Sequence, residues 1–242
     1  MDQPVSRARL LVEALPAAGE ECRIEGEEAA HARARRLAAG DPVILVDGSG
    51  REGHGKVERV TRTSLEVSVE SVVRVPADPH GPIHLLVAAV RSERLAWIAE
   101  KATELGAARL TLVASQRTQR FRASEALGPR LERVVREAAK QADRASWPSI
   151  AGPIPLADVL RGERAPARLI LDPSGEPFAS TLPVGATALL VGPEGGWTEA
   201  ELDAALAAGW VTASLAAGKL RAETAAVAAL TLARAALARG GR

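Results

Sequence analysis

Apolar positions in the first 75 residues form short runs separated by turn residues. Val43–Val46 and Leu65–Val69 have the composition of β-strands, and Asp47–Gly50 follows the first of them. Asp-Gly between apolar runs favours a hairpin, because these residues tolerate the positive φ angles of tight turns. One helix is expected among the strands, from Glu27 to Ala38. The pattern predicts a small β-barrel with little room for a catalytic pocket.

Beyond residue 82 longer apolar runs alternate with segments of helical periodicity. The expected strands are Ile83–Val90, Leu110–Ala114, Arg168–Leu171, Ala186–Val191 and Val211–Leu215, and the expected helices are Glu93–Leu105, Pro129–Arg144, Glu199–Ala208 and Ala222–Ala238. Unbroken apolar strands that alternate with helices indicate a mostly parallel sheet covered on both faces. We therefore expect an α/β domain that binds its ligand at the carboxyl ends of its strands.

Composition limits the kind of protein and the kind of site. Residues 74–82 contain three prolines and a glycine and are the predicted linker. The chain is 47% hydrophobic, enough for a folded core, and its one cysteine, Cys22, excludes an intrachain disulfide. We expect no metal, because Cys/His clusters suited to zinc are missing. The sequence has neither a signal-peptide pattern nor an apolar run of membrane-span length, so we expect a cytoplasmic protein.

The charges are unevenly distributed although the formal net charge is only +1. Residues 1–80 contain 11 basic and 14 acidic residues, whereas residues 91–144 contain 12 basic and 7 acidic residues. In the basic stretch no acidic residue separates Arg109, Arg117, Arg120 and Arg122. These arginines predict either a patch that faces phosphates or an ordinary solvated surface, and charge alone leaves both open.

The first segment with candidate chemistry joins an apolar strand to a helix through Gly192-Pro193-Glu194-Gly195-Gly196. Glycines let backbone groups approach a ligand closely, and Thr198 with Glu201 predicts a capping box at the start of the helix. A tight turn without a binding role would have the same glycines. The Lys-Ser/Thr of a phosphate-binding loop and the G-x-G-x-x-G pattern are both missing, which disfavours nucleoside triphosphate hydrolysis.

The second segment, Ser214–Ala226, contains a strand end, a loop and the start of an alanine-rich helix. Glu223 and Thr224 stand in the first helical turn, where the helix dipole favours a negative charge. This helix start suits a polar ligand, and simple helix initiation is the alternative.

These two segments together resemble the paired signature of the RsmE family, Gly192–Gly196 followed by Leu220-Arg221-Ala222-Glu223-Thr224-Ala225. Further blocks resemble the family in the same order, namely Lys101–Gly106, Ser115–Thr118 and Glu137–Arg144. His31–Gly40 and Val46–Gly48 resemble its PUA-like barrel. The resemblance therefore covers nearly the whole chain.

The resemblance implies a PUA-like β-barrel RNA-binding domain in residues 1–75 and a SPOUT methyltransferase domain with a deep trefoil knot in residues 76–242. It further implies a homodimer that uses S-adenosylmethionine (SAM), without a metal, to methylate N3 of a uridine in small-subunit (16S) ribosomal RNA. The cofactor-binding residues it implies are Leu171, Leu190, Val191, Gly192, Pro193, Glu194, Gly195, Gly196, Leu215, Gly218, Leu220 and Thr224.

Methylation of N3 requires removal of the imide proton, stabilisation of the resulting anion and an aligned methyl donor. Arg221 and Arg117 suit the stabilising role, because guanidinium donates forked hydrogen bonds and keeps its proton. Glu223 is the carboxylate expected to orient such an arginine or to accept the proton. Gln141 and Arg144 are expected on one helix face, with plain solvation as the alternative for Arg144. The expected RNA contacts are Arg33, Arg36, Arg120, Arg122, Gln141 and Arg144.

Three positions depart from the family pattern and leave alternatives open. Ala216 stands where the family usually has glycine, Lys219 where it has an aliphatic residue, and Lys140 where it often has glutamate. A non-catalytic RNA-binding or ribosome-assembly protein with the same fold is one alternative. A SPOUT methyltransferase that acts on another RNA nucleotide, in ribosomal RNA or in tRNA, is the other.

Overall fold

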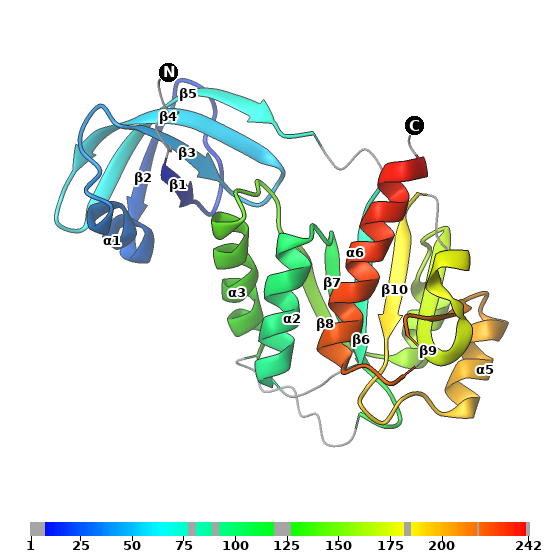
Figure 1. The fold of residues 1–242 in the computed structure, drawn as a ribbon. Coiled ribbons are helices and arrows are strands. Elements are labelled where there is room, and N and C mark those ends of the chain that lie inside the picture. Colours follow the sequence, from blue (N-terminus) through cyan, green and yellow to red (C-terminus); the bar gives the residue numbers. More distant parts are fainter. Residues whose placement is uncertain are drawn as a thin grey trace. The chain divides into compact units, whose positions relative to one another are not determined.

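The computed structural model describes residues 8–76, 81–88, 92–118, 127–181, 185–216 and 218–240 (Figure 1). Contacts divide the chain into two units. One comprises Met1–Ala77 with Ala139–Ser146, and the other comprises Asp78–Ala138 with Trp147–Arg242. The boundary predicted from the sequence lies after residue 75, whereas this division falls after Ala77 and assigns residues 139–146 to the first unit.

The first unit contains a five-stranded sheet in the order β1-β3-β4-β5-β2. Strands β1 and β3 are parallel, and the other neighbours are antiparallel. The fully buried Leu10, Leu45 and Leu65 belong to its core. The predicted hairpin at Asp47–Gly50 is confirmed between β3 and β4. The elements are β1 Ala8–Leu11, β2 Glu21–Glu25, α1 Gly26–Ala34, β3 Pro42–Val46, β4 Arg51–Val60 and β5 Ser64–Arg74.

Helix α1 ends at Ala34, four residues before the end expected from the sequence. Arg36 adopts a left-handed conformation with a φ of 59°. The N–H of Arg36 bonds to the carbonyl of Arg33 at 2.8 Å, and the N–H of Leu37 bonds to that of Ala32 at 3.1 Å. These two bonds form a Schellman cap, which stops the helix although helix-forming residues continue beyond it.

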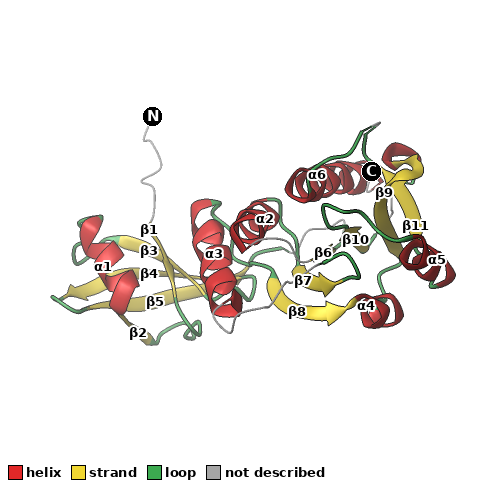
Figure 2. Cartoon of the chain, turned by 90° about the horizontal axis from the view of Figure 1, so that it is seen from below, coloured by secondary structure: helices red, strands yellow, loops and turns green. Residues whose placement is uncertain are grey.

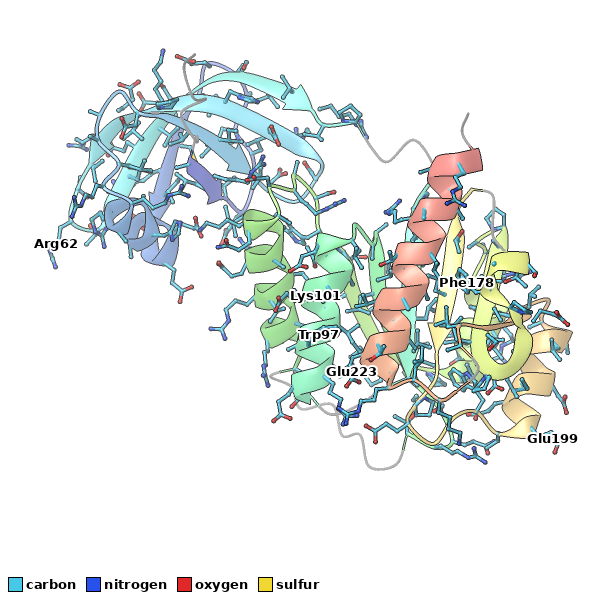
Figure 3. All side chains as sticks on the ribbon, viewed as in Figure 1. Arg62, Trp97, Lys101, Phe178, Glu199 and Glu223 are labelled. Atoms are coloured by element: carbon cyan, nitrogen blue, oxygen red, sulfur yellow. The ribbon has the colours of Figure 1, made fainter. Side chains whose placement is uncertain are left out.

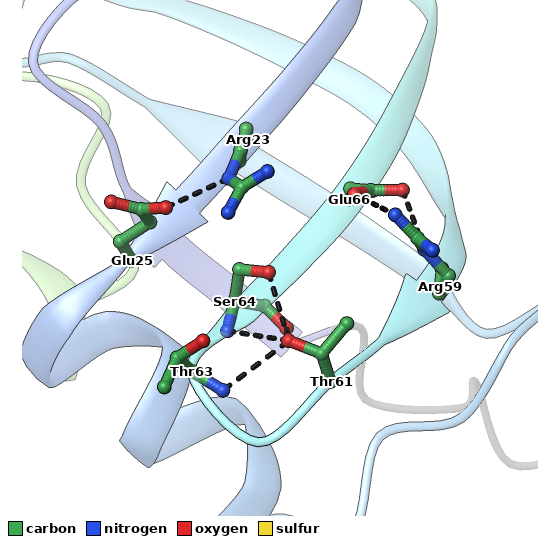
Figure 4. Close-up of polar contacts among 7 residues, drawn as sticks. All are labelled: Arg23, Glu25, Arg59, Thr61, Thr63, Ser64 and Glu66. Atoms are coloured by element: carbon green, nitrogen blue, oxygen red, sulfur yellow. Dashed lines mark hydrogen bonds and ion pairs between the residues drawn. The ribbon is translucent and has the colours of Figure 1, made fainter.

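The hairpin between β4 and β5 is held by its own side chains (Figure 4). Thr61 Oγ1 accepts hydrogen bonds from the backbone N–H of Ser64 at 2.9 Å and of Thr63 at 3.2 Å. Arg59 and Glu66, opposite each other on the two strands, form two bonds of 2.6 and 2.9 Å, which lower the pKa of Glu66. The turn and the cross-strand pair therefore support the same register.

Residues 139–146 pack on the first unit through one buried ion pair and several weaker contacts. Lys140, only 7% exposed, donates to Glu28 Oε1 at 2.7 Å. Asp143 lies 3.5 Å from Arg9 Nε, and the carbonyl of Ala145 accepts a bond from the N–H of Gly50 at 3.1 Å. Lys140 is one of the departures from the family pattern, and its ion pair with Glu28 explains why a lysine stands there.

The mostly parallel sheet predicted for the second unit is confirmed: six strands lie in the order β11-β9-β10-β6-β7-β8, and every neighbouring pair is parallel. Figure 2 shows α2 and α6 on one side of the sheet and α4 and α5 on the other, and the core clusters divide in the same way. The elements are β6 Ile83–Ala88, α2 Ser92–Glu104, β7 Arg109–Ala114, α3 Leu127–Gln141, β8 Ser149–Pro155, α4 Leu156–Gly162, β9 Ala167–Pro177, a 3₁₀ turn Phe178–Ser180, β10 Thr187–Val191, α5 Glu199–Ala207, β11 Val211–Ser214 and α6 Ala222–Gly240.

The strand order reverses beside β6, the first strand of this sheet. Strands β7 and β8 extend from β6 on one side, whereas β10, β9 and β11 lie on the other. Such a reversal opens a crevice at the carboxyl ends of the strands, where ligands of α/β proteins bind. Within the described parts of the chain, no helix combines the length and hydropathy needed to cross a membrane.

Glu163, directly after α4, should make the stability of the fold depend on acid pH. It accepts bonds from His84 Nδ1 at 3.3 Å and from the N–H groups of Arg164 and Ala165 at 2.8 Å each, and the His84 bond contributes most to lowering the pKa of Glu163 from 4.5 to about 2. A lowered carboxyl pKa stabilises the fold above pH 4.5 and loses this effect as the pH falls to about 2. We expect Glu163→Gln to lower the free energy of unfolding by about 2 kcal/mol at neutral pH.

Chemical denaturation of both proteins at several pH values checks this expectation. The difference in free energy of unfolding between wild type and Glu163→Gln should shrink between pH 4.5 and about 2. A difference that stays constant over this range would assign the effect to lost packing and not to the charge.

Candidate active site

A pocket of about 370 Å³ lies at the carboxyl ends of β10 and β11 and beside the middle of β9. Residues from within β9, the segments that follow β10 and β11, and the first turn of α6 line it. The pocket is lined by Arg117, Leu171, Asp172, Pro173, Ser174, Val191, Gly192, Pro193, Glu194, Gly195, Gly196, Trp197, Ala213, Ser214, Leu215, Ala216, Gly218, Lys219, Leu220, Ala222 and Ala225.

The loop Gly192–Gly196, here called the glycine loop, is anchored by the residue that follows it. Trp197 is 5% exposed, and its indole N–H donates to the carbonyl of Leu171 at 3.1 Å. A Cβ on Gly192 would lie only 3.0 Å from this ring. Glycine at this position therefore lets the loop lie directly on the indole, with its backbone facing the pocket.

Arg117, in the turn after β7, also binds the glycine loop. Its Nη1 donates to the carbonyls of Gly195 at 2.7 Å and of Trp197 at 2.9 Å. A Cβ on Gly195 would lie 3.4 Å from the side chain of Arg117, so the two residues are in close contact. The sequence assigned Arg117 to catalysis, and the structure places it in the pocket wall with part of its guanidinium bound to the loop.

The predicted capping box at the start of α5 is confirmed and extends to the turn that holds Arg117. Glu201 accepts a bond from the N–H of Thr198 at 2.9 Å, and Thr198 Oγ1 accepts one from the N–H of Glu201 at 3.3 Å. The other carboxylate oxygen of Glu201 accepts the N–H of Gln116 at 2.8 Å. Since Glu201 is 5% exposed, these bonds lie away from water and hold the turn firmly to the glycine loop.

The segment after β11 also lines the pocket, through Ser214–Ala216 and Gly218–Leu220. Ala216 and Lys219, both departures from the family pattern, line the pocket there. In the first turn of α6, Ala222 and Ala225 line the pocket. The two segments singled out in the sequence therefore meet around one cavity.

Glu223 does not line this pocket. Its Oε1 lies 3.7 Å from Nε of Arg94, in the first turn of α2, and Arg94 also forms an ion pair with Glu194 of the glycine loop. Figure 3 shows Glu223 near the beginning of α6. Arg94 was not predicted as a site residue, because nothing in its local sequence pattern distinguishes it from a solvated helix residue.

The predicted cofactor residues separate into two groups. Those that line the pocket are Leu171, Val191, Gly192, Pro193, Glu194, Gly195, Gly196, Leu215, Gly218 and Leu220. Leu190 and Thr224 do not. Successive strand residues point to opposite faces, so Leu190 lies in the core beside α4 and α5, while Thr224 is exposed on α6. Arg221 is also exposed, directly after Leu220.

The predicted RNA contacts lie in several places. Arg33 and Arg36 are exposed on the first unit, and Gln141 and Arg144 lie in the segment that packs on it. The expectation that Gln141 and Arg144 share a helix face is wrong. Helix α3 ends at Gln141, because Asp143 adopts a left-handed φ of 52°. Arg120 and Arg122 lie outside the described residues.

Asp172, Pro173 and Ser174 line the pocket but were not predicted. They follow Leu171 in β9, which continues to Pro177 and pairs with β11 on both sides of an irregularity. Their position directly after the apolar run predicted as a strand, which ends at Leu171, was the available signal. For metals, the described residues contain no group of three or more His, Cys, Asp or Glu side chains suited to hold an ion.

Comparisons with known proteins agree with this geometry. Residues 76–234 match the RNA methyltransferase domain family, and residues 24–70 match the RNA methyltransferase PUA domain family. Ribosomal RNA small subunit methyltransferase E of Mycobacterium tuberculosis is 34% identical over 90% of this chain and 88% of that protein, and the Bacillus subtilis protein of the same name is 27% identical over 86% and 87%.

Solved structures resemble the whole chain. A probable rRNA-methyltransferase from Porphyromonas gingivalis superposes with a TM-score of 0.87 and 29% identity, covering 96% of this chain and 99% of that one. A methyltransferase from Legionella pneumophila, solved in complex with SAM, superposes with a TM-score of 0.85 and 27% identity, covering 96% and 98%. The pocket, the two matched domains and these relatives agree, and the chain therefore belongs to the ribosomal RNA small subunit methyltransferase E family.

Proposed function

We propose that this protein transfers the methyl group of SAM to N3 of a uridine in small-subunit (16S) ribosomal RNA. The observation that carries the proposal is the pocket beside β9, β10 and β11 that both the glycine loop and the segment after β11 line. The SAM complex of the Legionella relative supports the choice of cofactor. Homodimer assembly and the trefoil knot are part of the proposal on the family resemblance.

The lining of the pocket fits SAM in size and in chemistry. Its volume of about 370 Å³ lies within the usual range for small-molecule sites. Leu171, Val191 and Leu215 supply an apolar wall suited to the adenine ring. SAM carries both positive groups and a carboxylate, and the lining offers Asp172 and Glu194 together with Arg117 and Lys219. The glycines of the loop bring backbone hydrogen-bonding groups to the pocket wall without bulky side chains of their own.

SAM supplies an electrophilic methyl group when it is bound. The protein has to orient the uracil ring and to stabilise the negative charge that develops on its carbonyl oxygens as the N3 proton leaves. Arg221 suits this task, because it is exposed beside the pocket residue Leu220. Arg117 would contribute from inside the pocket. The contact with Arg94 favours an orienting role for Glu223 over proton acceptance.

Contacts to the rest of the RNA are proposed for the exposed Arg33 and Arg36 of the first unit and for Gln141 and Arg144. Guanidinium groups bind phosphates through paired hydrogen bonds, and such contacts position the nucleic acid without reading its sequence.

The proposal is tested in two steps with the purified protein. Calorimetry should show saturable binding of SAM, and 16S rRNA from a strain that lacks this modification should gain one 3-methyluridine, located by mass spectrometry of nuclease fragments. Absence of SAM binding at millimolar concentration would favour the non-catalytic alternative. Methylation at another base, or in tRNA only, would assign the pocket to a different RNA target.

A further inference from the structure

Arg94 contacts two carboxylates, each carried by a chain segment that lines the pocket. One is Glu194 of the glycine loop, and the other is Glu223 in the first turn of α6. Arg94 itself lies in the first turn of α2, which packs against α6. A single side chain outside the pocket therefore contacts both chain segments that enclose it.

The side chains in the first turn of α6 point in two directions. Ala222 and Ala225, three positions apart and so on the same side of the helix, line the pocket. Glu223 is rotated from Ala222 by about 100° and meets Arg94. A shift of the helix turn that carries Glu223, toward or away from Arg94, therefore also moves the two alanines that line the pocket.

Burial strengthens the contact between Glu223 and Arg94. The side chain of Glu223 is 17% exposed and that of Arg94 is 28% exposed, whereas Glu194 is 60% exposed. The second carboxylate oxygen of Glu223, Oε2, is buried and has no hydrogen-bond partner among the described residues. Without Arg94, Glu223 would hold a charge away from water with no cation described beside it, which is costly.

We propose that Arg94 is a positioning residue that holds the glycine loop and the start of α6 together, and that this contact sets the width of the cofactor pocket. The inference rests on the proposed function, because it assigns SAM to that pocket. Under this inference Glu223 does not touch the reacting atoms. Arg94 affects the bound cofactor and substrate only indirectly, through Glu194 and Glu223.

Calorimetry with SAM tests the inference on three variants of the full chain. Arg94→Ala should weaken SAM binding about tenfold, because both segments lose their shared partner. Arg94→Lys keeps a cation and should recover most of the affinity. The matched control is Lys101→Ala. Lys101, on the same helix (Figure 3), also pairs with two carboxylates, Glu100 and Glu104 at 2.7 Å each, but lies outside the pocket lining.

Lys101→Ala should bind SAM like the wild type. Equal affinity of Arg94→Ala and wild type would overturn the inference, and so would equal losses in Arg94→Ala and Lys101→Ala.

Hydrogen exchange without any cofactor separates this inference from the proposed function. In Arg94→Ala, amides in residues 194–197 and in residues 223–226 should exchange at least several-fold faster than in the wild type, and both segments should change together. Lys101→Ala should leave both unchanged. If the wild type bound no SAM, the proposed function would fail while the exchange data still decided the role of Arg94. Unchanged exchange in both segments of Arg94→Ala would refute that role.

Discussion

Arg221→Ala should reduce the rate of methyl transfer by about 100- to 1000-fold, the usual cost of removing one donor that stabilises an oxyanion. The side chain is exposed and makes no hydrogen bond or ion pair within the part of the chain that the structure describes. Its removal should therefore leave the melting temperature unchanged and SAM affinity within about threefold. Single-turnover methylation of 16S rRNA, with calorimetry of SAM on the same preparation, separates the chemical step from binding.

Two further variants identify the reason for this loss. Arg221→Lys keeps the charge without the planar fork and should recover only part of the activity, because a point charge cannot donate two parallel bonds. Arg239→Ala removes another exposed arginine of α6, near the other end of the helix, and should leave the rate unchanged. Full activity in Arg221→Ala would exclude the residue from anion stabilisation and leave Arg117 as the arginine candidate.

The sheet of the second unit could be predicted because its inner strands are buried on both faces. Thr187–Val191 is buried at every position, and an uninterrupted apolar run of this kind predicts a parallel strand from the sequence alone. Strand β8, Ser149–Pro155, was missed because it lies at the edge of the sheet, contains two prolines and has no buried position. Apolar periodicity detects burial, so an edge strand gives little signal.

The packing of residues 139–146 on the first unit could not be predicted for a different reason. The pair between Lys140 and Glu28 joins positions 112 residues apart, and the left-handed Asp143 ends α3 within a sequence that favours helix. Both features depend on tertiary contacts that override local propensity. Lys140 appeared in the sequence only as a departure from the family pattern.

The site was predicted where local chain geometry determines it and missed where a distant residue does. Glycines after a buried strand indicated the glycine loop, and strand alternation alone removes Leu190 from the pocket. Arg94 precedes Glu223 by more than half of the chain, and only the packing of α2 on α6 brings them together. Glu223 was therefore predicted as a catalytic residue, whereas in the structure it contacts Arg94 on another helix.

Gly175→Ala should be the most destabilising single change near the pocket. A Cβ at this position would lie 2.6 Å from backbone atoms of Thr212 and Ala213 in β11, closer than real Cβ contacts, and backbone has no rotamer to move away. Strand β9 or β11 must therefore shift. We expect a loss of about 3 kcal/mol in the free energy of unfolding, or a fall of about 10 °C in melting temperature.

The same substitution should also weaken SAM binding, because the strands that shift carry pocket residues on both sides of the contact. Asp172–Ser174 precede Gly175 directly, and Ala213 and Ser214 of the paired strand β11 line the same pocket. Gly162→Ala is the matched control. Gly162 is the last residue of α4 and has open space around it, so alanine there should be neutral or stabilise the helix by up to about 1 kcal/mol. Equal melting temperatures and SAM affinities of the two variants would show that β9 and β11 tolerate separation at this point and that the pocket does not depend on their close approach.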